Sequence, residues 1–374
     1  MKVRFIILLF LIFNMFFIAG CSNIEQLDDK MIIHGVGIDR VENTFELTIQ
    51  QFSVTGSNEK EEGAQVVKTK GNSLMDAFSD LSLQTGKTPM FSQNLVLAIG
   101  EETAYNGIND ILDFFVRYYE SRPTVKIIIV KGKAESVLSF KKDDKLIMAK
   151  DIMAITESER INSKVMSSNI FQFVGALKNA TLDPIASIVS VERQNDEEIL
   201  AANGTAVFKN DKLAGFIDTN STRGALIINN RLNGGTEVID VESVGKVSYS
   251  LEKSKSKVKF KLENGKPVYN IIIKINTNIY EIERNIKNQL PDNTFNLMEE
   301  ALISRIKTIT SQAIYKSIFE YNSDIFGFGQ IALKSDKEYF RTVENNWDQV
   351  MKEAKYNIDV SVKIDDTGQG VGYS

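Results

Sequence analysis

The segment VKFKLENGKPVYNIIIKI, residues 258–275, determines the architecture of the second half of this chain. From Val258 to Leu262, apolar residues alternate with lysines, which is the pattern of a strand with one buried face. Asn264-Gly265 is a strong signal for a two-residue hairpin turn, and a second apolar segment follows it. The second half is therefore predicted to open as antiparallel sheet.

Around this hairpin the sequence predicts further strands and two amphipathic helices. Met298, Leu302 and Ile306 begin an apolar stripe with helical spacing, so we expect a long helix at residues 294–320. A second helix is expected at about 340–354, and an alternating strand at 355–364. The strands expected upstream of the hairpin are at residues 204–209, 213–218, 236–241 and 246–251.

The first half combines strands with helices that pack on them. Strands at 31–38 and 45–49 are predicted to form a hairpin, and a helix is expected to begin after Ser73 and to end at Gly86. The fold class is therefore α+β, multi-domain, with mixed and antiparallel sheets and packed amphipathic helices.

The polar segment at 194–198 is taken as the main domain boundary. This interpretation gives a signal peptide at 1–20, an N-terminal α/β domain at 21–195 and a C-terminal α+β domain at 196–374. An alternative divides the N-terminal domain into two lobes, the second of them mostly helical from about residue 134.

Cys21 is the only cysteine, and it follows a leader with an export-signal pattern. Lys2 and Arg4 precede an apolar run that is too short for a confident membrane span, and small residues lie just before the cysteine. This pattern resembles a bacterial lipobox, in which the thiol is diacylglycerated and becomes the new N-terminus. The alternatives are an ordinary signal peptide or an uncleaved anchor with a coincidental cysteine.

The charge of the chain argues against nucleic-acid binding. The formal charge of −5 becomes −7 once Lys2 and Arg4 leave with the leader. A nucleic-acid-binding protein would carry a basic patch or stripe. The lysines between Lys253 and Lys261 alternate with other residues and are interpreted as one solvated strand face.

The sequence lacks the side chains that most catalytic and metal sites need. His34 is the only histidine, and with no second cysteine after processing neither a zinc site nor a histidine-based triad can form. His34 is interpreted as a core or edge imidazole, with a general base as the alternative. No enzyme activity, cofactor or metal is expected.

Three further patterns are interpreted as structural. Gly86-Lys87-Thr88 lacks the earlier glycine of a phosphate loop, because position 81 is leucine. Gly35 and Gly37 lie in a strand, where glycines mark a bulge or close backbone packing. Acidic pairs such as Asp143-Asp144 lie in polar segments and are interpreted as surface charge.

Several motifs occur together and in a fixed order along the chain. They are Gly35-Val36-Gly37-Ile38-Asp39, Asp113-Phe114-Phe115-Val116-Arg117, Lys131-Gly132-Lys133-Ala134, Gly204-Thr205-Ala206-Val207-Phe208-Lys209 and Asp324-Ile325-Phe326-Gly327-Phe328-Gly329. With these motifs the chain resembles the Ger(x)C family, the lipoprotein C subunits of spore germinant receptors. It departs from the family just after Cys21, where many members carry a Trp-Asp pair and this chain has Ser22-Asn23.

The resemblance implies a lipid-anchored, noncatalytic subunit required for nutrient-triggered germination, held on the outer face of the inner spore membrane. Its implied partners are the A subunit and the multi-spanning B subunit of the receptor. Gly132, Gly204, Gly215, Gly327 and Gly329 in and beside these motifs are expected at turns that need special backbone angles. Phe326, Phe328 and Trp347 are expected in a core or interface. The alternative functions are a lipid-anchored solute-binding protein of a transporter and an exported cell-wall hydrolase.

Overall fold

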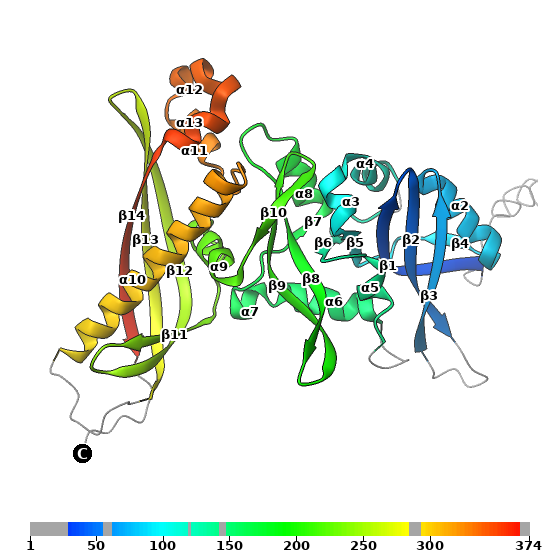
Figure 1. The fold of residues 1–374 in the computed structure, drawn as a ribbon, viewed down its shortest axis with the longest axis horizontal. Helices are drawn as coiled ribbons and strands as arrows, with labels where there is room; N and C mark the ends of the chain where they lie inside the picture. The colour runs from blue at the N-terminus through cyan, green and yellow to red at the C-terminus, as the bar shows by residue number, and fades with distance from the viewer. Residues whose placement is uncertain (1–28, 55–61, 119–120, 142–146, 284–292, 367–374) are drawn as a thin grey trace, which may run out of the picture.

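The computed structural model describes residues 29–54, 62–118, 121–141, 147–283 and 293–366. Cys21 and the predicted leader lie outside the described residues. The described chain forms two β-sheets that lie side by side along the longest axis of the molecule, each with its own helices (Figure 1). The predicted α+β class, with mixed sheets and packed helices, is confirmed.

A ten-stranded sheet occupies the first part of the chain. Its strands are β1 (Lys30–Val41), β2 (Thr44–Val54), β3 (Glu62–Gly71), β4 (Thr88–Met90), β5 (Val96–Gly100), β6 (Lys126–Val130), β7 (Ser168–Asn169), β8 (Ile185–Gln194), β9 (Glu197–Lys209) and β10 (Lys212–Ile217). The strand order is β10-β9-β8-β6-β5-β1-β2-β3, with β4 beside β1 and β7 beside β6. The pairs β1–β5, β5–β6 and β6–β8 are parallel.

Helices cover both faces of the central strands of this sheet. The helices of this region are α2 (Leu74–Thr85), α3 (Glu101–Asn106), α4 (Asn109–Arg117), α5 (Glu135–Leu138), α6 (Met148–Glu157), α7 (Glu159–Asn162) and α8 (Ile170–Leu177). One apolar cluster joins α2, α3, α4 and α8 to one face of the sheet. A second cluster joins α5 and α6 to the opposite face.

The helix cap and the glycine positions of this region agree with the sequence prediction. Ser73 caps α2, because its side chain accepts a hydrogen bond from the amide of Asp76, and Gly86 ends the helix with φ of 68°. The β1–β2 register shifts between Ile33 and Gly35, and a Cβ at Gly35 would approach the Leu138 side chain to 2.9 Å. The interpretation of Gly35 as a bulge with close packing is therefore confirmed.

The predicted domain boundary between residues 195 and 196 lies in the turn between β8 and β9. These two strands pair with each other across it, and the sheet continues to Ile217 at the end of β10. The division of the chain at this position stays a prediction.

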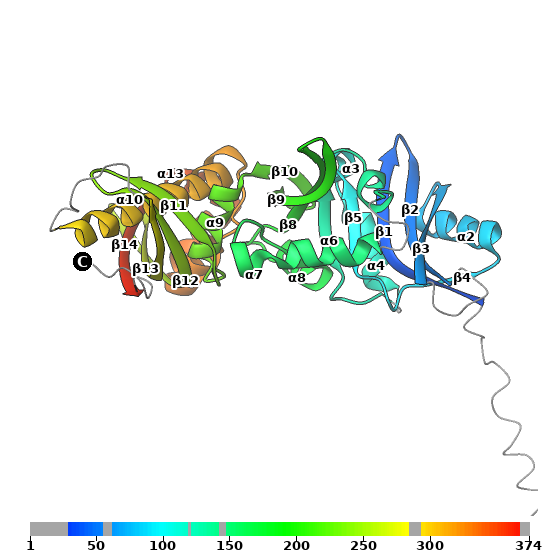
Figure 2. The same cartoon turned by 90° about the horizontal axis from the view of Figure 1, so that it is seen from below.

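A four-stranded sheet forms the second region. Its strands are β11 (Thr236–Val241), β12 (Gly245–Glu263), β13 (Lys266–Glu283) and β14 (Lys355–Asp366), in that spatial order. The helices that accompany it are α9 (Thr219–Ile228), α10 (Thr294–Ile314), the π-helical turn η2 (Tyr315–Glu320), α11 (Phe328–Ser335), α12 (Lys337–Val343), the 3₁₀ turn η3 (Glu344–Asn346) and α13 (Trp347–Glu353). Helix α10 crosses one face of the sheet (Figures 1 and 2).

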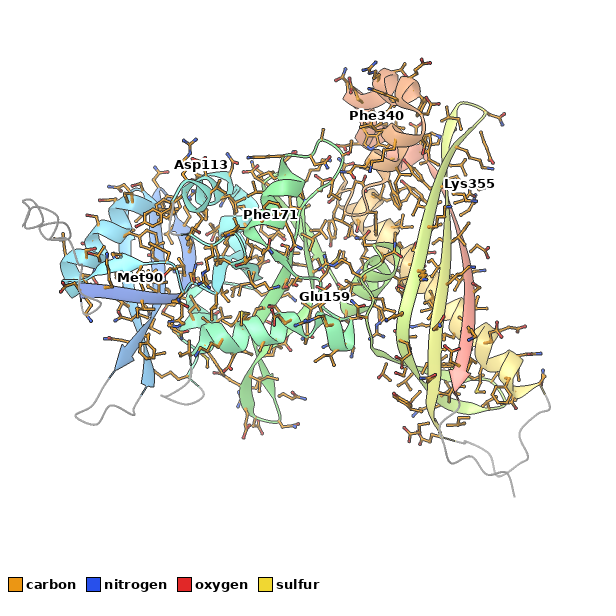
Figure 3. All side chains as sticks on the ribbon, turned by 180° about the vertical axis from the view of Figure 1, so that it is seen from behind. Met90, Asp113, Glu159, Phe171, Phe340 and Lys355 are labelled. Carbon is orange, nitrogen blue, oxygen red and sulfur yellow. The ribbon has the colours of Figure 1, made fainter. Side chains whose placement is uncertain are left out.

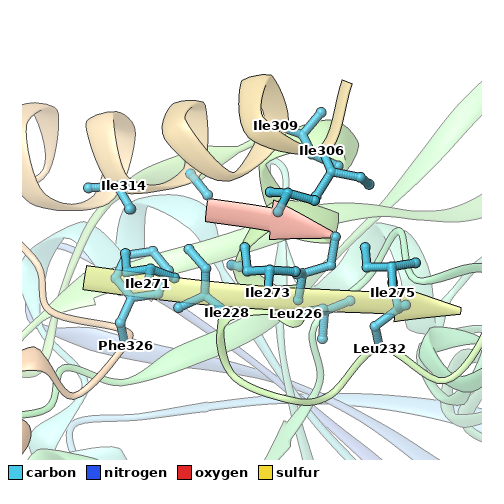
Figure 4. Close-up of a cluster of buried hydrophobic side chains, with 14 of the residues drawn as sticks. Leu226, Ile228, Leu232, Ile271, Ile273, Ile275, Ile306, Ile309, Ile314 and Phe326 are labelled. Atoms are coloured by element: carbon cyan, nitrogen blue, oxygen red, sulfur yellow. The ribbon is translucent and has the colours of Figure 1, made fainter. Parts of the chain in front are cut away.

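The core of this region lies between the sheet and its helices. Ile271, Ile273 and Ile275 alternate along β13 on the face that carries Ile306 and Ile309 of α10 (Figure 4). The β12–β13 hairpin turns at Asn264-Gly265, where both residues have positive φ. This is the backbone geometry that Asn-Gly favours in two-residue hairpins.

Two features of the second region differ from the sequence prediction. The strands expected at 246–251 and 258–262 are one strand, β12, with an irregularity between Leu251 and Lys253. The helix expected at 340–354 is two short helices, α12 and α13, separated by η3. The last strand, β14, pairs parallel to β13, so this sheet is mixed, in agreement with the predicted fold class. None of the helices among the described residues has the length and apolarity to cross a bilayer.

Candidate functional site at the junction of the two sheets

Two of the N-terminal motifs meet each other in the structure. The Asp39 carboxylate ends the first motif and is buried, and it accepts hydrogen bonds from the amides of Ala134 at 2.9 Å and Glu135 at 3.3 Å. Burial raises the pKa of this carboxyl, while these two amides act in the opposite direction. The amide of Glu101 also donates to the Gly132 carbonyl at 2.9 Å. These motifs therefore fix the start of α5 against β1.

The C-terminal motif forms a tight turn around the carboxylate of Asp324. This carboxylate accepts hydrogen bonds from the amides of Phe326, Phe328 and Gly329 at 3.1, 3.0 and 2.8 Å. Asp324 is 2% exposed, and burial raises its pKa to about 6, against the opposing effect of the three amides. The carboxylate is therefore used to hold the loop and is not open to a ligand.

This turn attaches the second region to the first. The amide of Asp324 donates to the Asp183 carboxylate at 2.8 Å, and the Ser323 hydroxyl donates to the Phe208 carbonyl at 2.7 Å. Lys209 then bridges Asp183 at 3.3 Å and Asp348 at 2.8 Å. Burial lowers the pKa of Lys209, but these carboxylates outweigh it and leave the pKa raised.

Five motif glycines were expected at turns with special backbone angles. Gly132, Gly204 and Gly327 have positive φ, which agrees with that expectation. Gly215 and Gly329 do not, and for them the expectation is wrong. A Cβ at Gly215 would lie 2.3 Å from the Tyr321 ring, and one at Gly329 would lie 2.7 Å from Trp347 Nε1. These two positions need glycine because the packing is close.

The motif aromatics are core residues, as expected. Phe328 is fully buried, Trp347 is 6% exposed and Phe326 is 9% exposed. Phe326 stacks on Phe328 with ring centroids 5.0 Å apart, and the Tyr269 hydroxyl donates to the Phe328 carbonyl at 3.0 Å. Together they close the end of the four-stranded sheet next to the junction.

A second set of contacts at the junction consists of buried ions. Arg223 of α9 and Glu237 of β11 form an ion pair in which each side chain is 4% exposed. Arg223 also donates to the carbonyls of Asn162 at 2.8 Å and Thr236 at 3.0 Å. Arg305 of α10 binds the other oxygen of Glu237 at 2.9 Å. Arg223 therefore links α7 of the first region to β11 of the second.

Glu159 and Arg231 form a further ionic contact across the junction. The guanidinium donates to both Glu159 oxygens, at 2.9 and 2.7 Å, and to the Ser167 carbonyl at 2.7 Å. Figure 3 shows Glu159 between the two regions. These contacts use both oxygens of the Glu159 carboxylate and three of the five N–H donors of Arg231, so the pair holds the junction together.

A groove of about 590 Å³ lies beside these contacts. Phe173 of α8 lines it from the first region, and Ile228, Phe326 and Gln330 line it from the second. Arg231 also lines it, and three of its five N–H donors bind Glu159 and Ser167. The groove has the size of a small-molecule site, and its polar lining combines side-chain amides, serine hydroxyls, the Asp183 carboxylate and Arg231.

The remaining residues that the sequence singled out lie away from this junction. His34 is half-buried in β1, and burial, followed by the charge of Lys150, lowers its pKa. Its Nδ1 has no hydrogen-bond partner among the described residues. Asp143-Asp144 lies outside the described residues, as does Cys21. Within the described ranges no cluster of His, Cys, Asp or Glu is arranged to hold a metal ion.

No pattern in the sequence indicates the buried ion network. Glu237 and Arg305 are far apart along the chain, and each occurs among other charged residues. A weak signal exists at Arg223, which lies in an otherwise uncharged helix that is buried from Ser221 to Ile228. Predicting that Arg223 pairs with Glu237 would require knowledge of the strand order.

Comparisons with known proteins agree with the motifs. Residues 23–191 match the spore germination protein N-terminal domain, and residues 203–368 match the spore germination B3/GerAC-like C-terminal family. The chain is similar to spore germination protein B3 of Bacillus subtilis (strain 168), with 22% identity covering 94% of this chain and 95% of that protein. Spore germination protein KC of the same organism is 23% identical, covering 89% and 88%.

A solved structure has the same fold. The crystal structure of the GerBC protein covers 92% of this chain and 100% of its own, with a TM-score of 0.57 and 20% identity. The two family matches leave little of the body after residue 22 unmatched. The chain therefore belongs to the GerAC-like family of spore germination C-subunit proteins.

Proposed function

We propose that this chain is the lipid-anchored, noncatalytic C subunit of a spore germinant receptor, required for nutrient-triggered germination. The observation that carries the proposal is that the family likeness spans both regions of the body and the junction between them. A module shared by proteins of different function would match over one region only.

The proposed anchor is a diacylglyceryl group on Cys21, on the outer face of the inner spore membrane. Two acyl chains hold a protein stably at a bilayer, whereas one chain binds only marginally. Lys30, where β1 begins, follows Cys21 by nine residues. An extended chain of that length spans at most roughly 30 Å, so the anchor would keep the body close to the membrane.

The proposed partners are the A subunit and the multi-spanning B subunit of the receptor. The internal contacts favour such a role, because the charged groups at the junction bind each other and stiffen the body. Tethering to the same membrane raises the local concentration of the subunits, so weak contacts between them suffice. The protein would then act through its surface, by binding the other subunits.

The anchor is tested by Cys21→Ala in the full-length chain, with Ser22→Ala as the matched control. Cys21→Ala should release the protein from spore membranes and abolish the nutrient response, because the acceptor thiol is lost. Ser22→Ala should change neither, since it leaves the thiol in place. Undiminished membrane retention of Cys21→Ala would contradict the anchor.

The receptor role is tested by co-purification with the A and B subunits, followed by cross-linking to map the contacts. The rival function, a transporter's solute-binding protein, requires the chain to bind a nutrient by itself. Calorimetry with nutrient amino acids and sugars should therefore show no heat of binding. Micromolar binding that Gln330→Ala in the junction groove weakens would favour the rival function instead.

A further inference from the structure

The four-stranded sheet has one face that no helix of the described residues covers, and lysines line it. Along β12, Lys253, Lys255, Lys257, Lys259 and Lys261 are all exposed. They lie two residues apart, so they share the face opposite α10 and follow one another at about 6.6 Å intervals. We call this surface, with its neighbours on β13 and β14, the lysine face.

Adjacent strands add to the positive charge. Lys274 of β13 pairs with Lys255, and Lys363 of β14 lies on the same face and is exposed. Lys261 and Lys363 form ion pairs with the nearby Glu263 and Asp365. Among the described residues, the lysines at 253, 255, 257, 259 and 274 make no ion pair. Asp359 of β14 also pairs into this part of the face, and the Glu252 carboxylate accepts a hydrogen bond from Asn278 Nδ2 at its end.

This charge distribution stands out because the chain as a whole is acidic, with a formal charge of −5. Next to these lysines the described part of the face has no exposed aromatic or arginine side chain of the kind that anchors protein–protein binding, although Tyr280, 69% exposed, lies farther along β13. Ile272 is its half-buried apolar residue at the centre, opposite Lys257. A flat, basic, anchor-free surface complements a flat anionic surface better than it complements a shaped protein partner.

The position of the lysine face relative to the anchor points to the same occupant. In Figure 2, α10 lies along the upper side of the second region and β12 and β14 lie along the lower side. Strand β1, which begins nine residues after Cys21, starts at the lower edge of the same view. The start of β1 and the lysine face therefore lie on the same side of the elongated body, at opposite ends.

We infer that the lysine face binds the anionic phospholipid headgroups of the membrane to which the chain is tethered, so that the body lies along the bilayer. This inference rests on the proposed Cys21 anchor. Each lysine near an anionic surface contributes about 1 kcal/mol. Lysines also protect sheet edges from pairing, but edge protection does not account for Lys274, which belongs to an interior strand.

The test measures which lysines the membrane shields from chemical acetylation. The full-length lipidated protein is reconstituted in vesicles of phosphatidylcholine, or of phosphatidylcholine with phosphatidylglycerol, and its amines are acetylated and mapped by mass spectrometry. Labelling of Lys255, Lys257 and Lys259 should fall roughly fivefold on the anionic vesicles, the factor that corresponds to about 1 kcal/mol. Lys212 and Lys307, which are exposed elsewhere, should label equally on both.

Salt and paired variants make the result specific to charge. At about 1 M NaCl, where the Debye length is about 3 Å, the shielding should disappear. The double variant K257Q/K259Q should lose most of the shielding at Lys255 and Lys274, whereas K212Q/K307Q, which removes the same charge, should keep it. Both variants should fold normally, because exposed substitutions of this kind change stability by only about ±0.5 kcal/mol.

Each remaining outcome contradicts a stated part of the argument. Equal labelling on both vesicles, in a protein that floats with both, would overturn the lysine face while leaving the anchor intact. Shielding that arises on phosphatidylcholine vesicles only after the A and B subunits are added would identify an acidic protein partner and would also overturn it. A lipidated chain that floats with neither vesicle would contradict the anchor, and with it this inference.

Discussion

The two sheets of this protein differ in how many of their faces are covered. Strand β6 lies at the centre of the first sheet, and Ile127 and Ile128 point into different apolar clusters on opposite faces. Strand β13 of the second sheet buries Ile273 against α10, while its neighbour Ile272 lies half-exposed on the lysine face. The first sheet is therefore an interior, and the second has a free surface.

This difference separates structural from interaction roles within one chain. A sheet with helices on both faces has no free face for a partner, and its strands read as continuous apolar runs. A sheet covered on one face alternates apolar and polar residues, and the polar face is available for contact. The ionic contacts at the junction hold these two regions in a fixed relation.

The largest expected loss of stability comes from Glu237→Gln, which removes the buried ion pair at the junction. The substitution leaves Arg223 buried without its charge partner, which typically costs about 3–5 kcal/mol. Chemical denaturation should show this loss and should separate the unfolding of the two sheets into two transitions. Glu135→Gln is the control, because its pair with Lys68 is solvent-exposed and is expected to contribute about 0–1 kcal/mol. If Glu237→Gln and Glu135→Gln lowered the free energy of unfolding by the same small amount, the buried pair would not couple the two sheets.

The next prediction compares isoleucines on covered sheet faces with an isoleucine on the open face. Truncating a buried isoleucine to alanine typically costs about 2–5 kcal/mol. Ile127→Ala and Ile128→Ala should both fall in that range, because β6 is buried on both faces. In β13, Ile273→Ala should do so, but Ile272→Ala should cost less than about 1 kcal/mol. The unfolding free energies of the four variants measure this, and a large loss for Ile272→Ala would mean that its face is covered.

Much of the fold followed from local signals in the sequence. The apolar stripe from Met298 to Ala313 lies on the buried face of α10, and the Asn264-Gly265 turn connects β12 and β13. The alternating lysines between Lys253 and Lys261 form a solvated strand face, as interpreted. These signals are carried by residues close together in the chain, so periodicity and turn chemistry were sufficient.

The errors arose where a local pattern has two structural solutions. Phe340 and Trp347 have helical spacing, but they pack on each other with ring centroids 4.8 Å apart across the 3₁₀ turn η3. The irregularity after Leu251 interrupts the period-two pattern, which made one strand look like two. Strand order and the pairing of Arg223 with Glu237 depend on contacts distant in sequence, and no single-sequence pattern encodes them.

The smallest of these effects concerns Asp324, whose loop attaches the second sheet to the first. Asp324→Asn should cost about 1–3 kcal/mol at pH 7, because the amide group cannot accept all three backbone hydrogen bonds. The folded-state pKa of about 6 exceeds the ordinary value of 3.8, so the folded protein takes up a proton at this carboxyl more readily than the unfolded chain. This contribution to stability is fully present below about pH 4 and is lost as the pH rises through 6. The stability gap between the wild type and Asp324→Asn should therefore widen from pH 7 to pH 5. Denaturation at the two pH values measures it, and a gap that narrows would mean that the amides, rather than burial, set the pKa.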